Sequence, residues 1–298
     1  MNLERSDNFG IERNIVWWGD SLTQALVTSL LQNMIQFGSI QNEGIGGQTA
    51  MQIACRQGGE PIRVSLTGGA FNGVNQVILS YVSTPFLSTP ASPVTPAYSG
   101  KINGIPCIIT RNTTGVSPVV EVSYTIRPVF SQNTVIADNS IFTPDVAVNA
   151  INDIQILWIG RNNVPNLAGV DFILDNMITN IAKPRRVVVI GVLNALNENK
   201  TTGIAAYNQV IAHNAIVKSK YPLNYVSSEP PTSAEMTRLA FTPDTTDLAD
   251  IDKGTIPTRM RGVITGPPVS VDPIHLNAIG AQLIVNRVFD KLKSLNLI

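Results

Sequence analysis

Continuous apolar runs alternate with helical patterns along most of the chain. The runs NIVWW, DIQILWI and RVVVIGV, at residues 14–18, 153–159 and 186–192, are typical of strands buried on both faces of a parallel sheet. A strand, a glycine-rich turn and a helix start follow one another in 39–57, and 224–228 is a further expected strand. Apolar residues recur at helical spacing in four segments: 22–37, 167–181, 202–218 and 276–295. Strands that alternate with helices predict an open, mostly parallel α/β sheet.

The interval from about residue 58 to residue 148 breaks this rhythm. Short β-branched runs occur there between turn clusters rich in Pro, Ser, Thr and Gly: IRVSL, QVILSYV, PCIIT and VVEVSYTI. Strands at such short spacing predict an all-β unit, and the interval is too long for a loop within a compact domain. We therefore expect a core of residues 1–57 plus 149–298 with a small β-domain, 58–148, inserted in it. An extended edge of the main sheet is the alternative, and residues 83–99 are expected to form one long hairpin loop.

The composition excludes several classes of partner. The 298 residues are 44% hydrophobic and 14% charged, with a formal net charge of +0. A neutral chain has no electrostatic footprint for nucleic acid or for an anionic membrane. There is no run of about 18 apolar residues, so we expect no membrane insertion, and the polar residues 1–14 lack the apolar core of a cleaved signal peptide. Charge is low against the roughly 25% of average domains, and the Asn, Thr, Ser and Gln that replace it fit an extracellular or sugar-facing protein.

Several chemically distinctive residues are expected to belong to the core. Cys55 and Cys107 form neither a metal nor a redox motif, so we interpret them as buried small apolar residues, the first helical and the second in a strand. Trp17 and Trp18 are neighbours on one expected strand and therefore point to opposite faces, so both cannot line one pocket. Trp158 is expected to pack in the core or near a site. No residues have metal-ligand spacing, and we expect neither a metal nor an organic cofactor.

A lone serine stands at the corner where the first apolar run ends, in WWGDSLT. A strand–turn–helix corner lifts the Ser21 hydroxyl out of the carboxyl edge of the sheet, where α/β proteins place their sites. It also aims the free N–H groups of the helix start at the same point. The corner alone leaves two interpretations open, because Ser21 can be a helix N-cap or a nucleophile.

The two histidines of the chain differ in their surroundings. His213 lies in a helical segment with no acid nearby and is expected to pack or to lie on the helix surface. His275 follows Asp272 by three residues in VDPIHLNAIG, just before the last helix. In a turn the two can share one face, where the carboxylate holds the imidazole N–H and stabilises its charged form. This is the orienter and base half of a catalytic triad, and a capping Asp beside a surface His is the alternative.

An early serine and a late Asp-x-x-His pair, in this order, resemble the SGNH (GDSL) hydrolase family. The first block of the family centres on Gly-Asp-Ser, and Ser21 matches its nucleophile. The last block is Asp-x-x-His, which Asp272 and His275 match. The resemblance implies a three-layer α/β/α core of the flavodoxin-like kind and the expected chemistry of a serine esterase: His275 takes the proton of Ser21, and Asp272 orients His275.

The two middle blocks of the family supply oxyanion donors. In NEGIGGQT, which begins at Asn42, Gly47 matches a backbone N–H donor. In Gly-Arg-Asn-Asn, which begins at residue 160, Asn162 matches the side-chain donor, and Asn163 stands where the family usually has Asp. The resemblance thus implies an oxyanion hole of Ser21, Gly47 and Asn162, and leaves the local hydrogen bonding of Asn163 open. Arg161 is expected either at the rim of the substrate site or as a solvated loop cation.

An SGNH core whose second and third blocks are separated by an inserted β-domain resembles the esterase domains of bacteriophage tail spikes, and so does the stretch 242–261. This second resemblance implies removal of O-acetyl groups from a bacterial surface polysaccharide, with the insertion holding the polysaccharide or packing between subunits. It also implies a virion-associated or extracellular-acting homo-oligomer, a trimer by analogy; a cytoplasmic location is the alternative. Two other functions stay open: a lipase- or thioesterase-type esterase acting on acyl esters, and a catalytically silent glycan-binding tail module.

Overall fold

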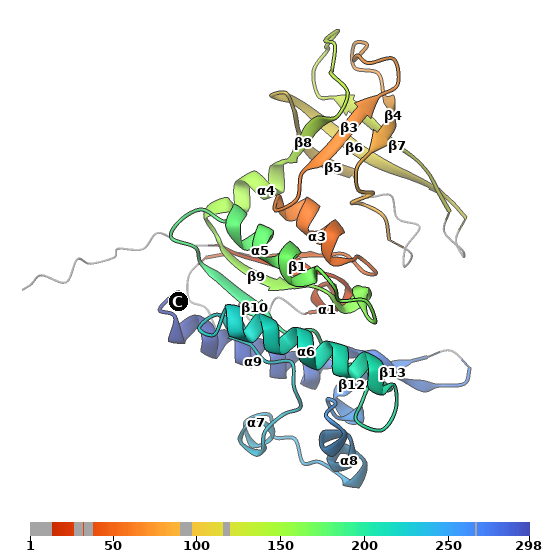
Figure 1. Cartoon of the computed structure of the whole chain (residues 1–298). Coiled ribbons are helices and arrows are strands. Elements are labelled where there is room, and N and C mark those ends of the chain that lie inside the picture. The colour runs from red at the N-terminus through yellow and green to blue at the C-terminus, as the bar shows by residue number, and fades with distance from the viewer. Residues whose placement is uncertain (1–13, 27–31, 33–37, 90–96, 116–119, 266) are drawn as a thin grey trace, which may run out of the picture.

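The computed structural model of the chain describes residues 14–26, 32, 38–89, 97–115, 120–265 and 267–298. It contains a five-stranded parallel sheet and a closed, six-stranded antiparallel barrel (Figure 1). The fold is therefore mixed α/β, as the alternation of strands and helices predicts, with an all-β unit in the interval that breaks this alternation.

The parallel sheet has the strand order β11-β10-β9-β1-β2. Its strands are β1 (Ile15–Gly19), β2 (Ile40–Gly44), β9 (Ile154–Trp158), β10 (Val187–Ile190) and β11 (Tyr225–Val226). Numbered along the core alone, this is the order 2-1-3-4-5, which is common among doubly wound α/β sheets. β1 pairs with β2 on one side and with β9 on the other, so the order reverses between β1 and β9. The carboxyl ends of these two strands border the crevice where such sheets hold their ligands.

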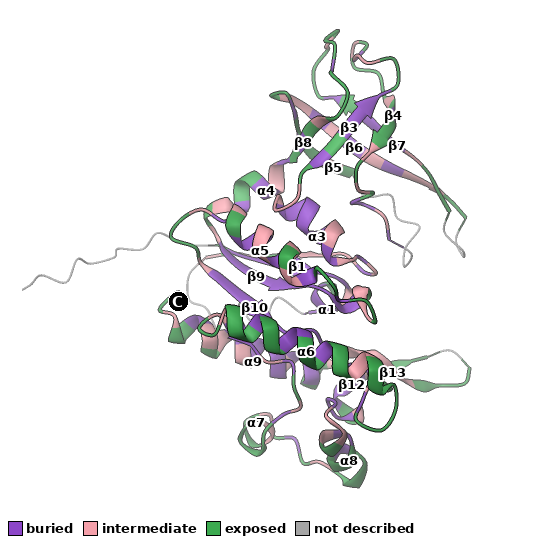
Figure 2. Cartoon of the chain, in the orientation of Figure 1, coloured by how far each residue is buried: buried purple, intermediate pink, exposed green. Residues whose placement is uncertain are grey.

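Helices cover both faces of this sheet. One face carries α3 (Ala50–Gln57), α5 (Val170–Asn180) and α6 (Ile204–Lys220), and the other carries α1 (Ser21–Gln24) and α9 (Ala278–Ser294). Trp17 is buried in the cluster that contains α9, whereas Trp18 is buried in the cluster that contains α3 and α5. Figure 2 shows buried strands between helices whose outer faces are exposed. The core therefore has three layers, and the two tryptophans point to opposite faces as predicted.

The barrel strands close in the order β3-β4-β7-β6-β5-β8. They are β3 (Ile62–Leu66), β4 (Val77–Val82), β5 (Ala97–Ile102), β6 (Ile105–Thr114), β7 (Val120–Pro128) and β8 (Ser140–Pro144). Among the described residues none of them pairs with the parallel sheet, so the alternative of an extended sheet edge is wrong. The hairpin expected over 83–99 is also wrong: this segment joins β4 to β5, which are not neighbours, because β4 pairs with β7 and β5 with β6 and β8. α4 (Asp145–Asn149) then leads back to the core.

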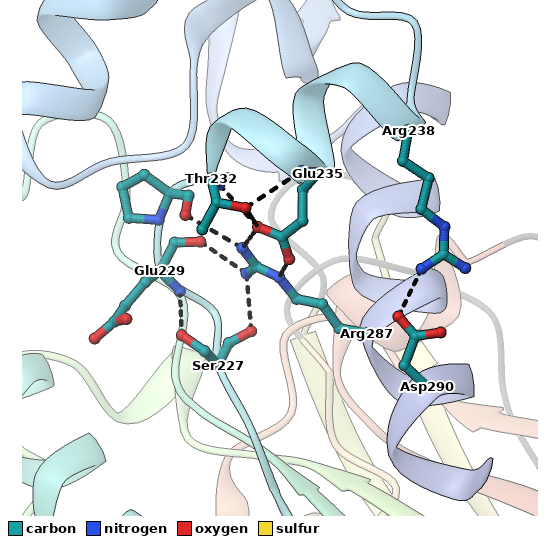
Figure 3. A network of polar contacts seen from close by, with 8 residues as sticks. Ser227, Glu229, Thr232, Glu235, Arg238, Arg287 and Asp290 are labelled. Carbon is teal, nitrogen blue, oxygen red and sulfur yellow. Dashed lines mark hydrogen bonds and ion pairs between the residues drawn. The ribbon is translucent and has the colours of Figure 1, made fainter. Parts of the chain in front are cut away.

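Between β11 and α9 the chain makes an excursion that the hydrophobic pattern did not predict. It forms α7 (Ser233–Arg238), α8 (Thr245–Lys253) and a hairpin of β12 (Arg261–Ile264) with β13 (Ser270–Leu276). Arg287 of α9 fixes the start of this excursion, because its guanidinium bonds both carboxylate oxygens of Glu235 at 2.6 and 2.9 Å (Figure 3). The same guanidinium donates to three main-chain carbonyls, those of Ser227, Glu229 and Pro230. α7 and α8 lie at the end of the molecule opposite the barrel (Figure 1).

The expected helix over 22–37 can be compared with the structure only at residues 22–26 and 32. α1 ends at Gln24, and most of the remaining range lies outside the described residues. The other expected core helices correspond to α5, α6 and α9 with ends shifted by a few residues. No helix in the described part of the chain combines the length and the apolar composition that a bilayer crossing requires.

Candidate active site

Ser21 stands at the carboxyl end of β1, where the strand turns at once into α1. Asp20 makes this turn possible, because its Oδ1 accepts the N–H of Leu22 at 2.9 Å and so caps the new helix. Gly19 is required by close packing, since a Cβ there would lie 2.7 Å from the carbonyl oxygen of Trp158 in the adjacent strand. Asp20, and not Ser21, is therefore the helix cap, which leaves the Ser21 hydroxyl free for another partner.

Asp272 and His275 lie in β13, not in a separate turn before the last helix as the sequence predicted. β13 is irregular here: Val271 faces Val263, but Leu276 already faces Arg261, so the strand bulges between these pairs. Within the bulge, Oδ1 of Asp272 accepts the N–H groups of Ile274 and His275, each at 2.8 Å. These bonds are those of a tight turn, which explains why the turn-like spacing still brings the two side chains to one face.

The structure brings Ser21, His275 and Asp272 into one hydrogen-bonded chain. Nε2 of His275 lies 2.8 Å from Oγ of Ser21, and Nδ1 lies 2.9 Å from Oδ2 of Asp272. Burial alone would raise the pKa of Asp272, but the hydrogen bonds from His275 and Ile274 outweigh it and hold this pKa below its usual value. Asp272 is therefore ionised at neutral pH and can keep the Nδ1 proton of the ring in place. The His275 side chain is 38% exposed, so the serine end of the chain is accessible from solvent.

The expected oxyanion donors approach the same corner from two other segments. Gly47 follows β2 and has a φ of +77°, a left-handed conformation that favours glycine. Asn162 lies in the single turn Arg161–Asn163 after β9, and its Nδ2 donates to the carbonyl of Gln48 at 3.0 Å. The second and third sequence blocks are thus joined directly. Among the described residues, the N–H groups of Ser21 and Gly47 have no hydrogen-bond partner, so both are available to a ligand.

Asn163 keeps a structural contact at the position where the resembling family usually has Asp. Its Oδ1 accepts the N–H of Ala50 at 2.8 Å, at the start of α3. An Asp carboxylate offers the same acceptor, so the difference leaves this hydrogen bond intact. The local hydrogen bonding that the sequence left open is therefore satisfied.

Arg161 is neither at an exposed rim nor a solvated cation, and both expectations for it are wrong. Its side chain is buried and forms a two-pronged ion pair with Glu198, with both contacts at 2.6 Å. It also donates to the carbonyl of Leu193 at 2.8 Å. Burial alone would raise the pKa of Glu198, but the Arg161 hydrogen bonds and the N–H of Ala195 hold it below its usual value. The guanidinium therefore fixes the segment after β10 against the turn that carries Asn162.

Asp20 is an unusual neighbour of the nucleophile. It is almost completely buried, and its Oδ2 has no hydrogen-bond partner among the described residues. Burial raises the pKa of Asp20 to about 6, although the hydrogen bond from Leu22 and the nearby charges of Arg161 and His275 lower it. A carboxyl group that titrates near neutral pH thus lies directly before Ser21.

The remaining residues singled out in the sequence are structural. Cys55 in α3 and Cys107 in β6 are buried free thiols, as predicted. Trp158 is buried, and its Nε1 donates to the carbonyl of Gly191 at 3.1 Å. His213 is buried in α6, where desolvation lowers its pKa despite the opposing charge of Asp171.

Comparisons with known proteins give no family. No family model and no curated protein matches the chain. Among solved structures, a Streptococcus pneumonia protein provisionally named a platelet activating factor is 13% identical, with a TM-score of 0.42 over 97% of this chain and 86% of that one. A gut microbial diltiazem-metabolizing enzyme is 10% identical, with a TM-score of 0.41 over 94% of this chain and 47% of that one. The chain thus spans about half the length of the second structure. Both TM-scores are below 0.5, so neither likeness supports a conclusion about fold or activity.

Proposed function

We propose that this chain is a serine esterase of the SGNH type. The observation that carries the proposal is the continuous chain of contacts from Ser21 to His275 at 2.8 Å and from His275 to Asp272 at 2.9 Å. Asp20 already caps α1, so a purely structural corner has no need of a histidine on the Ser21 hydroxyl. The geometry is that of a nucleophile, a general base and a group that orients the base.

The reaction follows from these contacts. Nε2 of His275 takes the proton of Ser21 as Oγ attacks the ester carbonyl, and Asp272 stabilises the imidazolium that forms. The N–H groups of Ser21 and Gly47 and the amide of Asn162 stabilise the developing oxyanion. When the tetrahedral intermediate collapses, the carbonyl–oxygen bond to the alcohol breaks and the alcohol oxygen takes the proton from His275. A water molecule then attacks the acyl-enzyme with the same base, which releases the acid and restores Ser21.

The substrate class that we propose is a carbohydrate bearing O-acetyl groups, such as a bacterial surface polysaccharide. Its support is the resemblance of the sequence blocks, separated by an inserted β-unit, to tail-spike esterase domains. The low charge of the chain, 14% of residues, adds to this support, because neutral polar side chains suit hydrogen bonding to sugar hydroxyls. A virion-associated or extracellular-acting homo-oligomer remains part of the same proposal.

An esterase for longer acyl chains is the second candidate, and one feature favours it. The β12–β13 hairpin, which carries Asp272 and His275, has three exposed apolar residues near its tip: Val263, Ile264 and Val269, which are 60%, 46% and 70% exposed. Exposed apolar side chains on the hairpin that carries the base can bind an acyl tail that extends from the site toward the hairpin tip. Preference for acyl length separates this candidate from an acetylesterase.

Acetate release tests the proposal. Wild type, Ser21→Ala and the surface control Ser294→Ala are incubated with a panel of acetylated bacterial polysaccharides and with p-nitrophenyl esters of short and long acids. We expect wild type and Ser294→Ala to release acetate from a polysaccharide and Ser21→Ala to release none while melting at the wild-type temperature. Equal activity of Ser21→Ala contradicts the serine mechanism.

Cleavage of long-chain esters without polysaccharide deacetylation keeps the mechanism and replaces the substrate. If wild type hydrolyses no ester and Ser21 does not react with a fluorophosphonate probe, the chain is not a serine esterase, and a glycan-binding module becomes the better interpretation.

A further inference from the structure

We propose that Gln48 and Arg56 are positioning residues for the oxyanion donors and that the barrel holds both of them in place. The inference rests on the proposed esterase function. It gives the inserted β-unit a part in forming the active site, in addition to any contact with the polysaccharide or with another subunit.

Gln48 links the two oxyanion donors that come from different segments. It directly follows Gly47, and its carbonyl oxygen accepts the Nδ2 group of Asn162 at 3.0 Å. Its own side chain is completely buried, at 0% exposure, and is bonded at both ends. Oε1 accepts Nε of Arg56 at 2.7 Å, and Nε2 donates to the carbonyl of Phe86 at 2.7 Å. A displacement of Gln48 therefore moves the Gly47 peptide and the Asn162 amide together.

Arg56 connects this turn to the strand that carries the nucleophile. Its guanidinium is completely buried and donates to the carbonyl of Gly19 at 3.2 Å, two residues before Ser21. It also donates to the carbonyl of Glu43 at 2.8 Å, at the end of β2. The guanidinium group of Arg56 thus donates to the end of β1, to the end of β2 and to the Gln48 side chain. The rigid, planar geometry of arginine suits this task better than a lysine ammonium.

The barrel supplies the other side of this network. The hydroxyl of Tyr98 in β5 accepts a hydrogen bond from Arg56 at 3.2 Å and donates to Oε2 of Glu43 at 2.7 Å. The hydroxyl of Thr89, in the segment after β4, donates to the carbonyl of Gly46. Thr89 thus bonds the residue before Gly47 directly, whereas Tyr98 reaches Gln48 through Arg56. Both residues belong to the all-β unit.

The segment that contacts the turn is itself anchored inside the barrel. The ring of Phe86 is completely buried, and its centroid lies 6.0 Å from that of Tyr98, 6.2 Å from that of Tyr124 and 6.1 Å from that of Phe142. The hydroxyl of Tyr124 accepts the N–H of Leu87 at 3.1 Å. The packed interior of the barrel is therefore continuous with the peptide groups that face the substrate carbonyl.

Oxyanion donors act only when they are held within about 0.5 Å of the productive geometry. Loss of one such donor typically lowers kcat by about 10²–10³-fold. A donor that is present but loosely held should cost part of this factor, and it should appear in kcat because the oxyanion exists only in the transition state and the intermediate. Loss of folded enzyme also lowers the apparent kcat and leaves KM unchanged, so kcat is expressed per folded enzyme and compared with a control variant.

The experiment measures kcat and KM for p-nitrophenyl acetate, a substrate too small to need contacts with the barrel. Gln48→Met keeps the side-chain length but removes both bonds, Arg56→Lys keeps the charge but loses the fork, and Tyr98→Phe removes one hydroxyl only. Arg287→Lys is the matched control, because that arginine is equally well bonded but its partners lie in 227–235.

We expect kcat to fall about tenfold or more in Gln48→Met and Arg56→Lys and about threefold in Tyr98→Phe, with KM changed less than about twofold. Arg287→Lys should lower the melting temperature and leave kcat unchanged.

Wild-type kcat in folded Gln48→Met and Tyr98→Phe overturns the inference, and so does an equal fall in Arg287→Lys, which would point to general destabilisation. If Gln48→Met does not fold, Tyr98→Phe decides the matter, because it keeps the aromatic packing. A wild-type protein without Ser21-dependent hydrolysis overturns the proposed function instead, and this inference falls with it.

Discussion

Nε2 of His275 lies 2.8 Å from Oγ of Ser21, although 254 positions of the chain separate the two residues. Three levels of structure produce this contact. Asp20 turns the end of β1 into α1 and exposes the Ser21 hydroxyl, and the carboxylate of Asp272 shapes the bulge that presents His275. The parallel sheet then places the end of β1 beside the hairpin. Substitutions of single side chains at the site and beside it test this arrangement.

Replacement of Asp272 by Asn should lower turnover strongly without unfolding the protein. The amide oxygen can still accept the N–H groups of Ile274 and His275, but the amide nitrogen cannot accept the hydrogen bond from Nδ1–H of the imidazole. The ring then loses the group that fixes its tautomer, and kcat should fall by about 10³–10⁴-fold. Steady-state kinetics with p-nitrophenyl acetate measure the change, and Asp171→Asn on the surface of α5 is the control. Turnover within threefold of wild type would show that Asp272 does not orient the base.

Replacement of Asn162 by Asp should remove its amide donor, both toward the oxyanion and toward the carbonyl of Gln48. A carboxylate is similar in size, but it cannot donate to an oxyanion and repels it, so kcat should fall by about 10²–10³-fold with a smaller change in KM. The adjacent Asn163→Asp is a closely matched control, since its Oδ1 still accepts the N–H of Ala50. We expect that control to keep activity within about twofold. If the two variants behave alike, Asn162 is not an oxyanion donor.

Asp20 should make stability depend on pH. Its pKa is raised from 3.8 in the unfolded chain to about 6 in the folded protein. The folded state therefore holds the proton more tightly, and the stability that this provides is complete below about pH 4 and lost as pH rises through about 6. Each pKa unit corresponds to about 1.4 kcal/mol. Asp20→Asn keeps the cap on Leu22 and cannot ionise, so its gain in unfolding free energy over wild type should grow from pH 4 to pH 7 in urea titrations. A gain that does not change with pH contradicts the raised pKa.

Removal of one partner of the Arg161–Glu198 pair should destabilise the fold strongly, because it leaves the other buried charge unpaired. Arg161→Met or Glu198→Gln alone should lower the unfolding free energy by about 3–5 kcal/mol, and the double variant by less than the sum. The pair of Lys220 with Asp171 is the control, since both side chains are partly exposed and such pairs contribute little. Additive losses at the buried pair would mean that the two groups act independently.

The sequence predicted the core well wherever a buried strand was a continuous apolar run. Strands β1, β9 and β10 were predicted for this reason. The hydrophobic pattern placed Ser21 at the carboxyl end of the first strand, whereas Asn162 was indicated by its match to a block of the resembling family. The catalytic roles given to these residues stay predictions, but the proximity of Ser21, Asp272 and His275 is now a structural fact. The sequence did not predict strand β13 (Ser270–Leu276), because the turn at Asp272 interrupts the alternation of apolar and polar residues in this segment.

The parts that the sequence did not predict depend on contacts between distant residues. Nothing near Arg161 indicates that Glu198 will neutralise it, and nothing near Arg56 indicates Gln48 or Tyr98 as partners. α7 and α8 are different, because each begins with a capping box that the sequence does contain, Thr232 with Glu235 and Asp244 with Asp247. These local signals predict the starts of both helices in 227–260.

The pairing of β3 with β8 has a consequence for how the chain reaches its native state. These are the first and last strands of the barrel, and Ile62 lies opposite Phe142. Once the barrel has formed, the residues where the chain enters and leaves it are neighbours. The barrel then connects the two core segments that flank it over a short distance. The entropic cost of bringing β1 beside β9 grows with the length of chain between them. Early formation of the barrel, whose β5–β6 and β6–β7 hairpins are local, would lower that cost by about 1 kcal/mol. The barrel would then aid assembly of the sheet that carries Ser21.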